Sequence, residues 1–328
     1  MKQRSLLLEK GVKMFSKCRV LISLVFVLSF MLPANGQTRA DALNAYNRGC
    51  KHYRDGDFDR AIADFTRAMD ISSAPTPGNQ GQNWKARMSF ASSEAELDPI
   101  TFVDPLTALA LSNRALARFR KGDMNGAIAD CDRGLFINPG LLILYHNRAA
   151  LRWATGNLDG AISDYDQLIR KNPRDAEAYN SRGNCRKDKG DIAGALIDLN
   201  EAIRLSPRRA EFYCDRGQAN LDKEDVDRAL ADFERAIELD AHLGRAYYWR
   251  GSTWCRKRDL NRAVSDFTKA IELDPHMAAA YGNRGLLRLR QGQAAEAEKD
   301  FAESLKNDPS LEAELRARIS EEKARLAR

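Results

Sequence analysis

Apolar and small residues recur along the chain with a step of 34 positions, and inside each step they follow the period of two helices. Position 8 of this repeat is Gly or Ala, position 20 is always Ala, and position 24 carries a larger side chain. A turn near position 15, in most copies marked by glycine, separates the two stripes, and a proline often follows the second stripe. Each copy is therefore predicted to form a helix–turn–helix hairpin, with the small residues where the two helices approach closely.

Seven such repeats cover most of the chain after residue 41. The predicted units are 42–75, 108–141, 142–175, 176–209, 210–243, 244–277 and 278–309, with an insert at 76–107 and a last helix at 310–328. The insert opens with a turn-rich stretch and is predicted to be a surface loop. Leu311, Leu315, Ile319 and Leu326 form one stripe of the last helix, which favours a solvating cap, with a partner-binding tail as the alternative.

In these positions the chain resembles the tetratricopeptide repeat (TPR) family. The resemblance implies an all-α fold, a right-handed α-solenoid of seven TPR helix-turn-helix repeats with a C-terminal capping helix, whose concave wall is lined by the first helix of each hairpin. It also implies the binding of peptides or proteins without catalysis. One departure is at position 4, where the tryptophan of the family is replaced by Tyr145, Tyr179, Tyr213, Tyr247 and Tyr281.

Two charged positions are as regular as the apolar ones. Position 7 is always arginine and position 23 is always aspartate: Arg48, Asp64, Arg114, Asp130, Arg148, Asp164, Arg182, Asp198, Arg216, Asp232, Arg250, Asp266, Arg284 and Asp300. The two positions are equally far from the turn, so they lie at the same height in an antiparallel hairpin. This predicts a structural ion-pair ladder, either within each unit or between one unit and the next.

If the first helices line a concave wall, positions 2, 5, 9, 12 and 13 face the groove. The candidate partner-binding residues are Tyr46, Tyr53, Phe119, His146, Trp153, Asn180, Asn184, Lys187, Tyr248, Arg256 and Arg290. The wall would change from aromatic through polar and acidic to basic, and a peptide could match that gradient. The alternative for each aromatic residue is packing between adjacent helices, because apolar stripes at helical spacing are usually core.

The first 36 residues have the form of a secretory signal peptide: a basic start, an apolar run from Val20 to Leu32, and small residues at Ala34 and Gly36. Export to the periplasm or out of the cell is expected, with cleavage after Gly36; the alternative is an uncleaved membrane tether. These residues hold six of the bases and one acid, so the remaining chain has a net charge of only +1. Nucleic-acid binding therefore loses its electrostatic support.

The sequence offers little for catalysis. Its four histidines lack metal-ligand spacing to one another, and neither a phosphate-binding loop nor a nucleophile elbow occurs in the repeats. We expect no enzyme activity, no metal and no cofactor.

The leading hypothesis is an exported scaffold that binds a protein or peptide in its groove. The alternative is a structural subunit of an envelope-associated assembly that uses its convex face and C-terminal helix. The sequence leaves the oligomeric state and the redox state of the cysteines open.

Overall fold

The computed structural model describes residues 36–72 and 105–326. These residues form fifteen α-helices and one short 3-10 helix. The chain divides into two compact units, with the boundary in the sequence after Pro173. The predicted leader, apart from Gly36, and residues 76–104 of the predicted insert lie outside the described residues. No helix in the described part of the chain has the length and apolar character needed to cross a bilayer.

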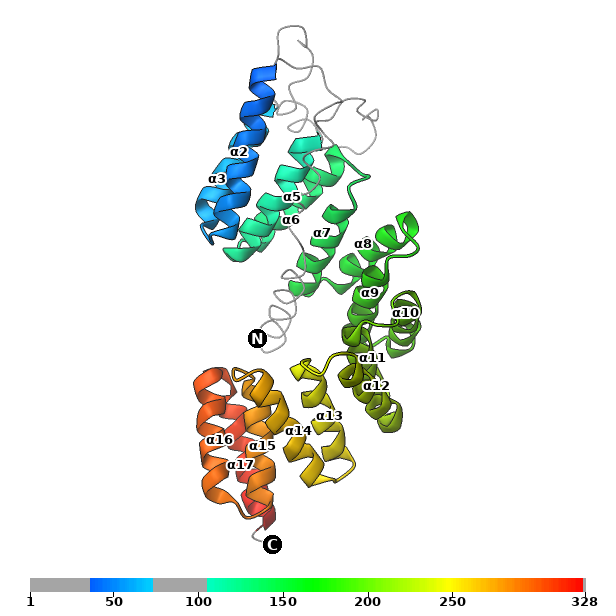
Figure 1. Ribbon diagram of the computed structural model, residues 1–328, viewed down its shortest axis with the longest axis vertical. Coiled ribbons are helices and arrows are strands. Elements are labelled where there is room, and N and C mark those ends of the chain that lie inside the picture. Colours follow the sequence, from blue (N-terminus) through cyan, green and yellow to red (C-terminus); the bar gives the residue numbers. More distant parts are fainter. Residues whose placement is uncertain (1–35, 73–104, 327–328) are drawn as a thin grey trace. The chain divides into compact units, whose positions relative to one another are not determined.

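The first unit contains three antiparallel hairpins. Helix α2 (Gly36–Arg54) pairs with α3 (Phe58–Ser72), α5 (Pro105–Arg120) with α6 (Met124–Ile137), and α7 (Leu142–Ala154) with α8 (Leu158–Lys171), as Figure 1 shows. Neighbouring hairpins join through α3 against α5 and α6 against α7. Residues 105–107, assigned above to the insert, form the first turn of α5, because proline is well accommodated at the first helical position.

The second unit contains four hairpins and a final helix. Helix α9 (Ala176–Lys189) pairs with α10 (Ile192–Leu205), α11 (Ala210–Asp222) with α12 (Val226–Leu239), α13 (Gly244–Arg256) with α14 (Leu260–Leu273), and α15 (Ala278–Arg290) with α16 (Ala294–Asn307). A 3-10 turn, Pro309–Leu311, leads into α17 (Glu312–Leu326), which packs against α15. The prediction of an all-α array of paired helices with a C-terminal helix is confirmed.

Each hairpin is held together where a small residue of its first helix meets a large residue of its second. A methyl group added at Gly217 would lie 2.6 Å from Cε1 of Phe233, and one at Gly285 would lie 2.5 Å from Cε1 of Phe301. The alanine at position 20 is fully buried in every hairpin. These contacts explain the regular spacing of small and large residues, since neither partner can change size without moving a helix.

The turn between the two helices needs a left-handed residue at position 15. Five hairpins place glycine there, with φ between +77° and +93°: Gly56, Gly122, Gly156, Gly190 and Gly292. The other two use Glu224 at φ 66° and Arg258 at φ 63°. An L-residue with a side chain is strained in this region, so these two turns carry a backbone cost that the glycine turns avoid.

Candidate functional site

The arginine and aspartate of each repeat meet within the same hairpin. In six hairpins the guanidinium forms a two-pronged fork with the carboxylate, with Nε at 2.8–3.1 Å and Nη2 at 2.6–2.7 Å from its two oxygens. The first hairpin is looser, because both nitrogens of Arg48 lie 3.4 Å from one oxygen of Asp64. Sequence position alone left open whether the pairs join helices within or between units, and the structure places them within.

A second donor, which the sequence analysis missed, reaches the same aspartate from position 11. Arg118, Arg152, Arg186 and Arg288 each place Nη1 2.8–2.9 Å from the carboxylate. Asn220 and His52 take this role in two other hairpins. The sequence feature that could have predicted this second donor is the recurrence of arginine one helical turn after position 7. The variety of residues at position 11, including Trp254, concealed it.

The remaining guanidinium nitrogen extends to the preceding hairpin. Nη1 of Arg114 donates to Oγ1 of Thr66 at 2.8 Å, and Nη1 of Arg148 lies 2.6 Å from Oδ1 of Asp132. In the second unit Arg216 reaches Asn200 and Arg284 reaches Thr268 in the same way. The tyrosines at position 4 add a third contact, with ring centroids 5.5–5.8 Å from the arginine Cζ. These arginines are therefore structural, with their donors already engaged.

Three of the predicted aromatic groove residues are core residues. Tyr46, Phe119 and Trp153 retain only 1%, 4% and 5% of their exposure. Tyr46 packs against Phe65 and accepts a hydrogen bond from Asn113 at 2.8 Å. The expectation that these three side chains line an open wall is corrected, because each first helix packs partly against its neighbours and its apolar positions fill that contact.

Two other predicted aromatic residues of the first unit are only half-buried. Tyr53 stands edge-on to Phe58, with centroids 5.5 Å apart, and His146 stands edge-on to Tyr165 at 6.0 Å. Both rings thus keep some exposed surface. Their role in binding stays a prediction.

In the second unit the predicted Asn180, Asn184 and Lys187 point from α9 toward α11. The amide nitrogens of Asn180 and Asn184 lie 2.8 and 3.0 Å from Oδ2 of Asp215, and Nζ of Lys187 lies 3.3 Å from Oε1 of Gln218. These side chains hold two first helices together, which corrects the expectation that they stand open to a ligand. The side-chain oxygen of Asn180 is buried without a hydrogen-bond partner in the described structure.

Asp215 lies at the centre of this cluster. Nη1 of Arg245 on α13 lies 3.0 Å from its Oδ1, and the carboxylate is only 9% exposed. Burial alone would raise the pKa of Asp215. Arg245 and the two asparagine amides outweigh burial and hold the pKa below its ordinary value. The cluster therefore links α9, α11 and α13 through one ionised carboxylate.

The remaining predicted residues lie nearer the surface. Tyr248 is half-buried and accepts a hydrogen bond from Asn283 at 3.3 Å. Arg256 is exposed and donates to the carbonyl oxygen of Leu221 at 3.0 Å. Arg290 is occupied by Glu322 of α17, with 2.6 Å between Nη2 and Oε2. An exposed acid, Asp222, occupies in α11 the position that Arg256 has in α13.

Most cysteines of the described chain are buried. No disulfide joins the five cysteines within the described residues, and burial raises the pKa of Cys214 and of Cys255 to about 11. Such thiols are mostly protonated at neutral pH and are poor nucleophiles. Within the described ranges no three His, Cys, Asp or Glu residues are grouped to hold a metal ion.

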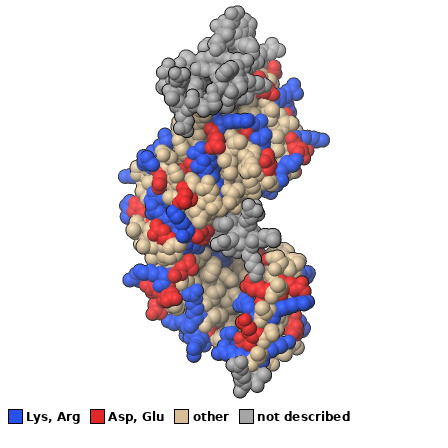
Figure 2. Space-filling view, turned by 180° about the vertical axis from the view of Figure 1, so that it is seen from behind, with Lys and Arg blue, Asp and Glu red and all other residues tan. Residues whose placement is uncertain are grey.

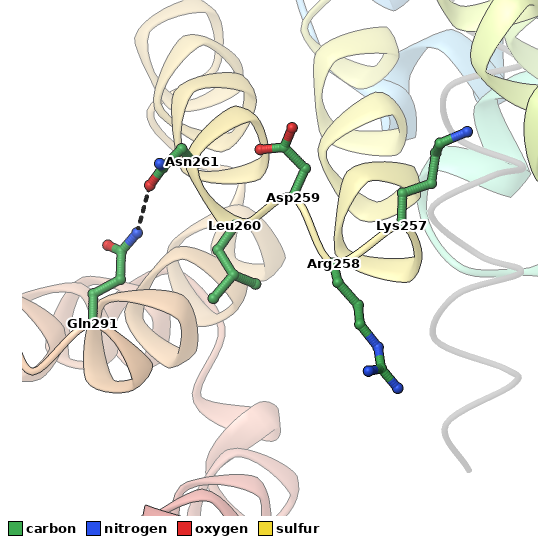
Figure 3. A pocket seen from close by; sticks show the side chains of 6 residues that line it. All are labelled: Lys257, Arg258, Asp259, Leu260, Asn261 and Gln291. Carbon is green, nitrogen blue, oxygen red and sulfur yellow. Dashed lines mark hydrogen bonds between the residues drawn. The ribbon is translucent and has the colours of Figure 1, made fainter.

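A surface pocket lies at the turn between α13 and α14, lined by Lys257, Arg258, Asp259, Leu260, Asn261 and Gln291 (Figure 3). Asn261 and Gln291 face one another across 3.1 Å, and Lys257 pairs with Asp227 at 2.5 Å. Asn261 and Gln291 thus satisfy each other, and Lys257 is engaged by an acid outside the pocket. Basic and acidic side chains are also interspersed over the described surface seen in Figure 2.

The fold and its repeated ion pairs define an α-helical repeat protein built from tandem hairpins. Tetratricopeptide repeat profiles match residues 84–141, 146–210 and 255–312, and a second profile of the same repeat matches 210–242. The chain belongs to the tetratricopeptide repeat family. Proteins of this family are typically non-catalytic scaffolds that bind proteins or peptides.

Of three similar solved structures, the first two support the fold. A tetratricopeptide repeat protein from Parabacteroides merdae is 19% identical with a TM-score of 0.65, over 87% of this chain and 100% of that one. PilW, a type IV pilus biogenesis factor, is 18% identical with a TM-score of 0.55, over 62% and 94%. MamA is 26% identical with a TM-score of 0.43, over 49% and 95%. The comparison with curated proteins finds no match.

Proposed function

We propose that the protein is an exported, non-catalytic scaffold that binds a peptide or protein segment along the first helices of its repeats. The observation that carries this proposal is the charge at position 13 of α11 and α13. Asp222 and Arg256 occupy equivalent positions on the two helices, both are exposed, and they have opposite sign. The charges that recur at positions 7 and 23 of every repeat already form ion pairs inside the array. These two remain available to give a partner its register.

Further charges extend the same surface at the start of the helices. Arg209 lies 2.5 Å from Glu177 and 3.3 Å from Glu211, and the three side chains are between 28% and 42% exposed. Surface ion pairs of this kind contribute little to stability, so a partner can exchange them at low cost. The part of the surface formed by α9, α11 and α13 therefore suits a polar segment with charges of both signs.

Charge reversal tests this assignment. Asp222→Lys combined with Arg256→Glu should abolish recovery of the partner when the protein is crosslinked in its native compartment and isolated. The matched control is Arg235→Glu with Glu238→Lys, a charge reversal on the second helix α12, where the two side chains are 48% and 64% exposed. Loss of partner only in the control would instead support a structural subunit that assembles through its second helices.

Export rests on the basic and apolar pattern of the first 36 residues. Expression of the full chain followed by fractionation and determination of the amino-terminal residue tests it. A soluble extracytoplasmic protein that begins at Gln37 is the expected result. A membrane-bound protein of full length would support the tether, and a full-length cytoplasmic protein would contradict export.

A further inference from the structure

Helix α17 departs from the stacking rule of the other hairpins. Each later first helix packs against the second helix of the preceding hairpin, as α13 does on α12 and α15 does on α14. Helix α17 instead lies mainly against α15, the first helix of the last hairpin (Figure 1). It thus covers the side of α15 that belongs to the proposed binding surface.

The contact between α17 and α15 has few anchors. Leu315 is 4% exposed and packs with Leu286 and Leu289 of α15, and Ile319 is partly buried beside it. Gly282 of α15 lies beside this contact, since a methyl group added there would be in ordinary van der Waals contact with Leu315, 3.6 Å from its Cδ1. Apart from these two aliphatic residues and Glu322, the helix is exposed.

An ion pair completes the contact. The side chain of Glu322 is 7% exposed, and its Oε2 lies 2.6 Å from Nη2 of Arg290. The hydrogen bond from Arg290 holds the pKa of Glu322 below its ordinary value although burial opposes it. At the other end of the contact Arg318 donates to Oδ1 of Asn283 at 2.8 Å. Leu315, Ile319 and Glu322 are four and three residues apart, so they lie on one face of the helix.

We propose that α17 is an intramolecular occupant of a docking surface on α15, and that the partner presents a helix with the same pattern of two aliphatic residues and an acid. Gly282 and the two leucines receive the aliphatic side chains, and Arg290 pairs with the acid. Release of α17 exposes this surface, so the covered state is autoinhibited. The inference rests on the proposed function, since it gives the chemistry of a partner for the first helices.

The test uses the full chain and a fluorescent peptide of residues 312–326 as probe. In the Glu322→Arg variant the tail is repelled by Arg290, so the peptide should bind at least ~10-fold more tightly than it binds the wild type, the change expected when one competing contact is removed. Arg290→Glu combined with Leu315→Ala and Ile319→Ala, which leaves Glu322 of the tail repelled by the new acid, should abolish binding of this peptide and permit binding of a peptide in which Glu322 is replaced by Arg. A second variant, Leu315→Ala with Ile319→Ala, releases the tail without altering charge and should also bind the probe.

Absence of probe binding to both released variants, or binding that is indifferent to Arg290→Glu, would overturn the proposal. Hydrogen exchange of α13 and α14 in each variant reports whether the neighbouring hairpin stays folded. The outcome is separable from that of the Asp222 and Arg256 experiment, which alters neither α15 nor α17. A partner that is retained there, together with the expected probe binding here, means that only the proposed function fails. Loss of the partner there, without probe binding here, means that only the α17 proposal fails.

Discussion

The guanidinium of Arg114 and the carboxylate of Asp130 face each other through two parallel hydrogen bonds of 2.9 and 2.7 Å, and the aspartate side chain is completely buried. In the first hairpin the equivalent pair, Arg48 and Asp64, has side chains that are 49% and 15% exposed and contacts of 3.4 Å. One charged motif thus occurs in a buried and in a partly solvated form in the same chain.

This difference predicts unequal costs for the same substitution. Asp130→Ala should destabilise the protein by about 3 kcal/mol, because it leaves buried guanidinium groups without their anion. Asp64→Ala should cost about 1 kcal/mol or less, since water can solvate Arg48. Urea unfolding followed by circular dichroism measures both. If both substitutions lower the free energy of unfolding equally, burial does not determine how much each arginine–aspartate pair contributes to stability.

The two strained turns predict a gain in stability. Glu224→Gly and Arg258→Gly remove the cost of a left-handed residue with a side chain, which is about 1 kcal/mol, although the more flexible unfolded chain offsets part of it. Gly156→Ala is the opposite change at the same position of another hairpin and should destabilise. Thermal unfolding should show higher midpoints for the first two variants and a lower one for the third. A lower unfolding midpoint for Glu224→Gly would contradict the inference that the left-handed backbone of Glu224 is strained.

The contact between Gly285 and Phe301 predicts a steric penalty that depends on its partner. Gly285→Ala should cost about 2 kcal/mol, because the new methyl group meets both the ring and, at 3.2 Å, the backbone oxygen of Ala297. In a Phe301→Ala background the same change should cost much less, since the ring is gone. A double-mutant cycle measures the coupling. Additive effects would mean that the helices move apart to accept the methyl group.

The Asp215 cluster predicts a contribution to stability that depends on pH. The folded state holds the pKa of this carboxyl below its ordinary value of 3.8, so the contribution is complete above that value and is lost as the pH falls below it. Asp215→Asn should therefore reduce stability at pH 7, and the difference from wild type should shrink toward pH 2. Urea unfolding at both pH values measures this. A difference that is constant with pH would exclude the ionised carboxylate as its source.

The repeat frame was predictable from sequence because its constraints are local and periodic. A small residue at position 8 and a large one at position 24 have to face each other in any hairpin of this length, and the same holds for Arg182 and Asp198. The surface was harder to predict. Asn184 and Lys187 occupy positions that face both the groove and the next first helix, and periodicity does not distinguish a residue that is open from one that its neighbour covers.

The covering of α15 by α17 was beyond the sequence pattern for a related reason. The stripe of Leu315 and Ile319 indicates that the last helix packs on something, and it was interpreted as a cap over the end of the array. Which helix it covers depends on individual contacts such as the pair of Arg290 and Glu322, and that pair is not part of the repeat pattern.

The arginines that reach the preceding hairpin fix the height at which neighbouring hairpins stack. Surfaces of small apolar residues would allow two helices to slide past one another with little loss of contact. A shift of one helical turn, about 5.4 Å, would separate Arg114 from Thr66 and Arg148 from Asp132, because a planar cation fits its acceptors at one height only. Slippage along the helix axis is thereby opposed at these joints by directional bonds as well as by packing.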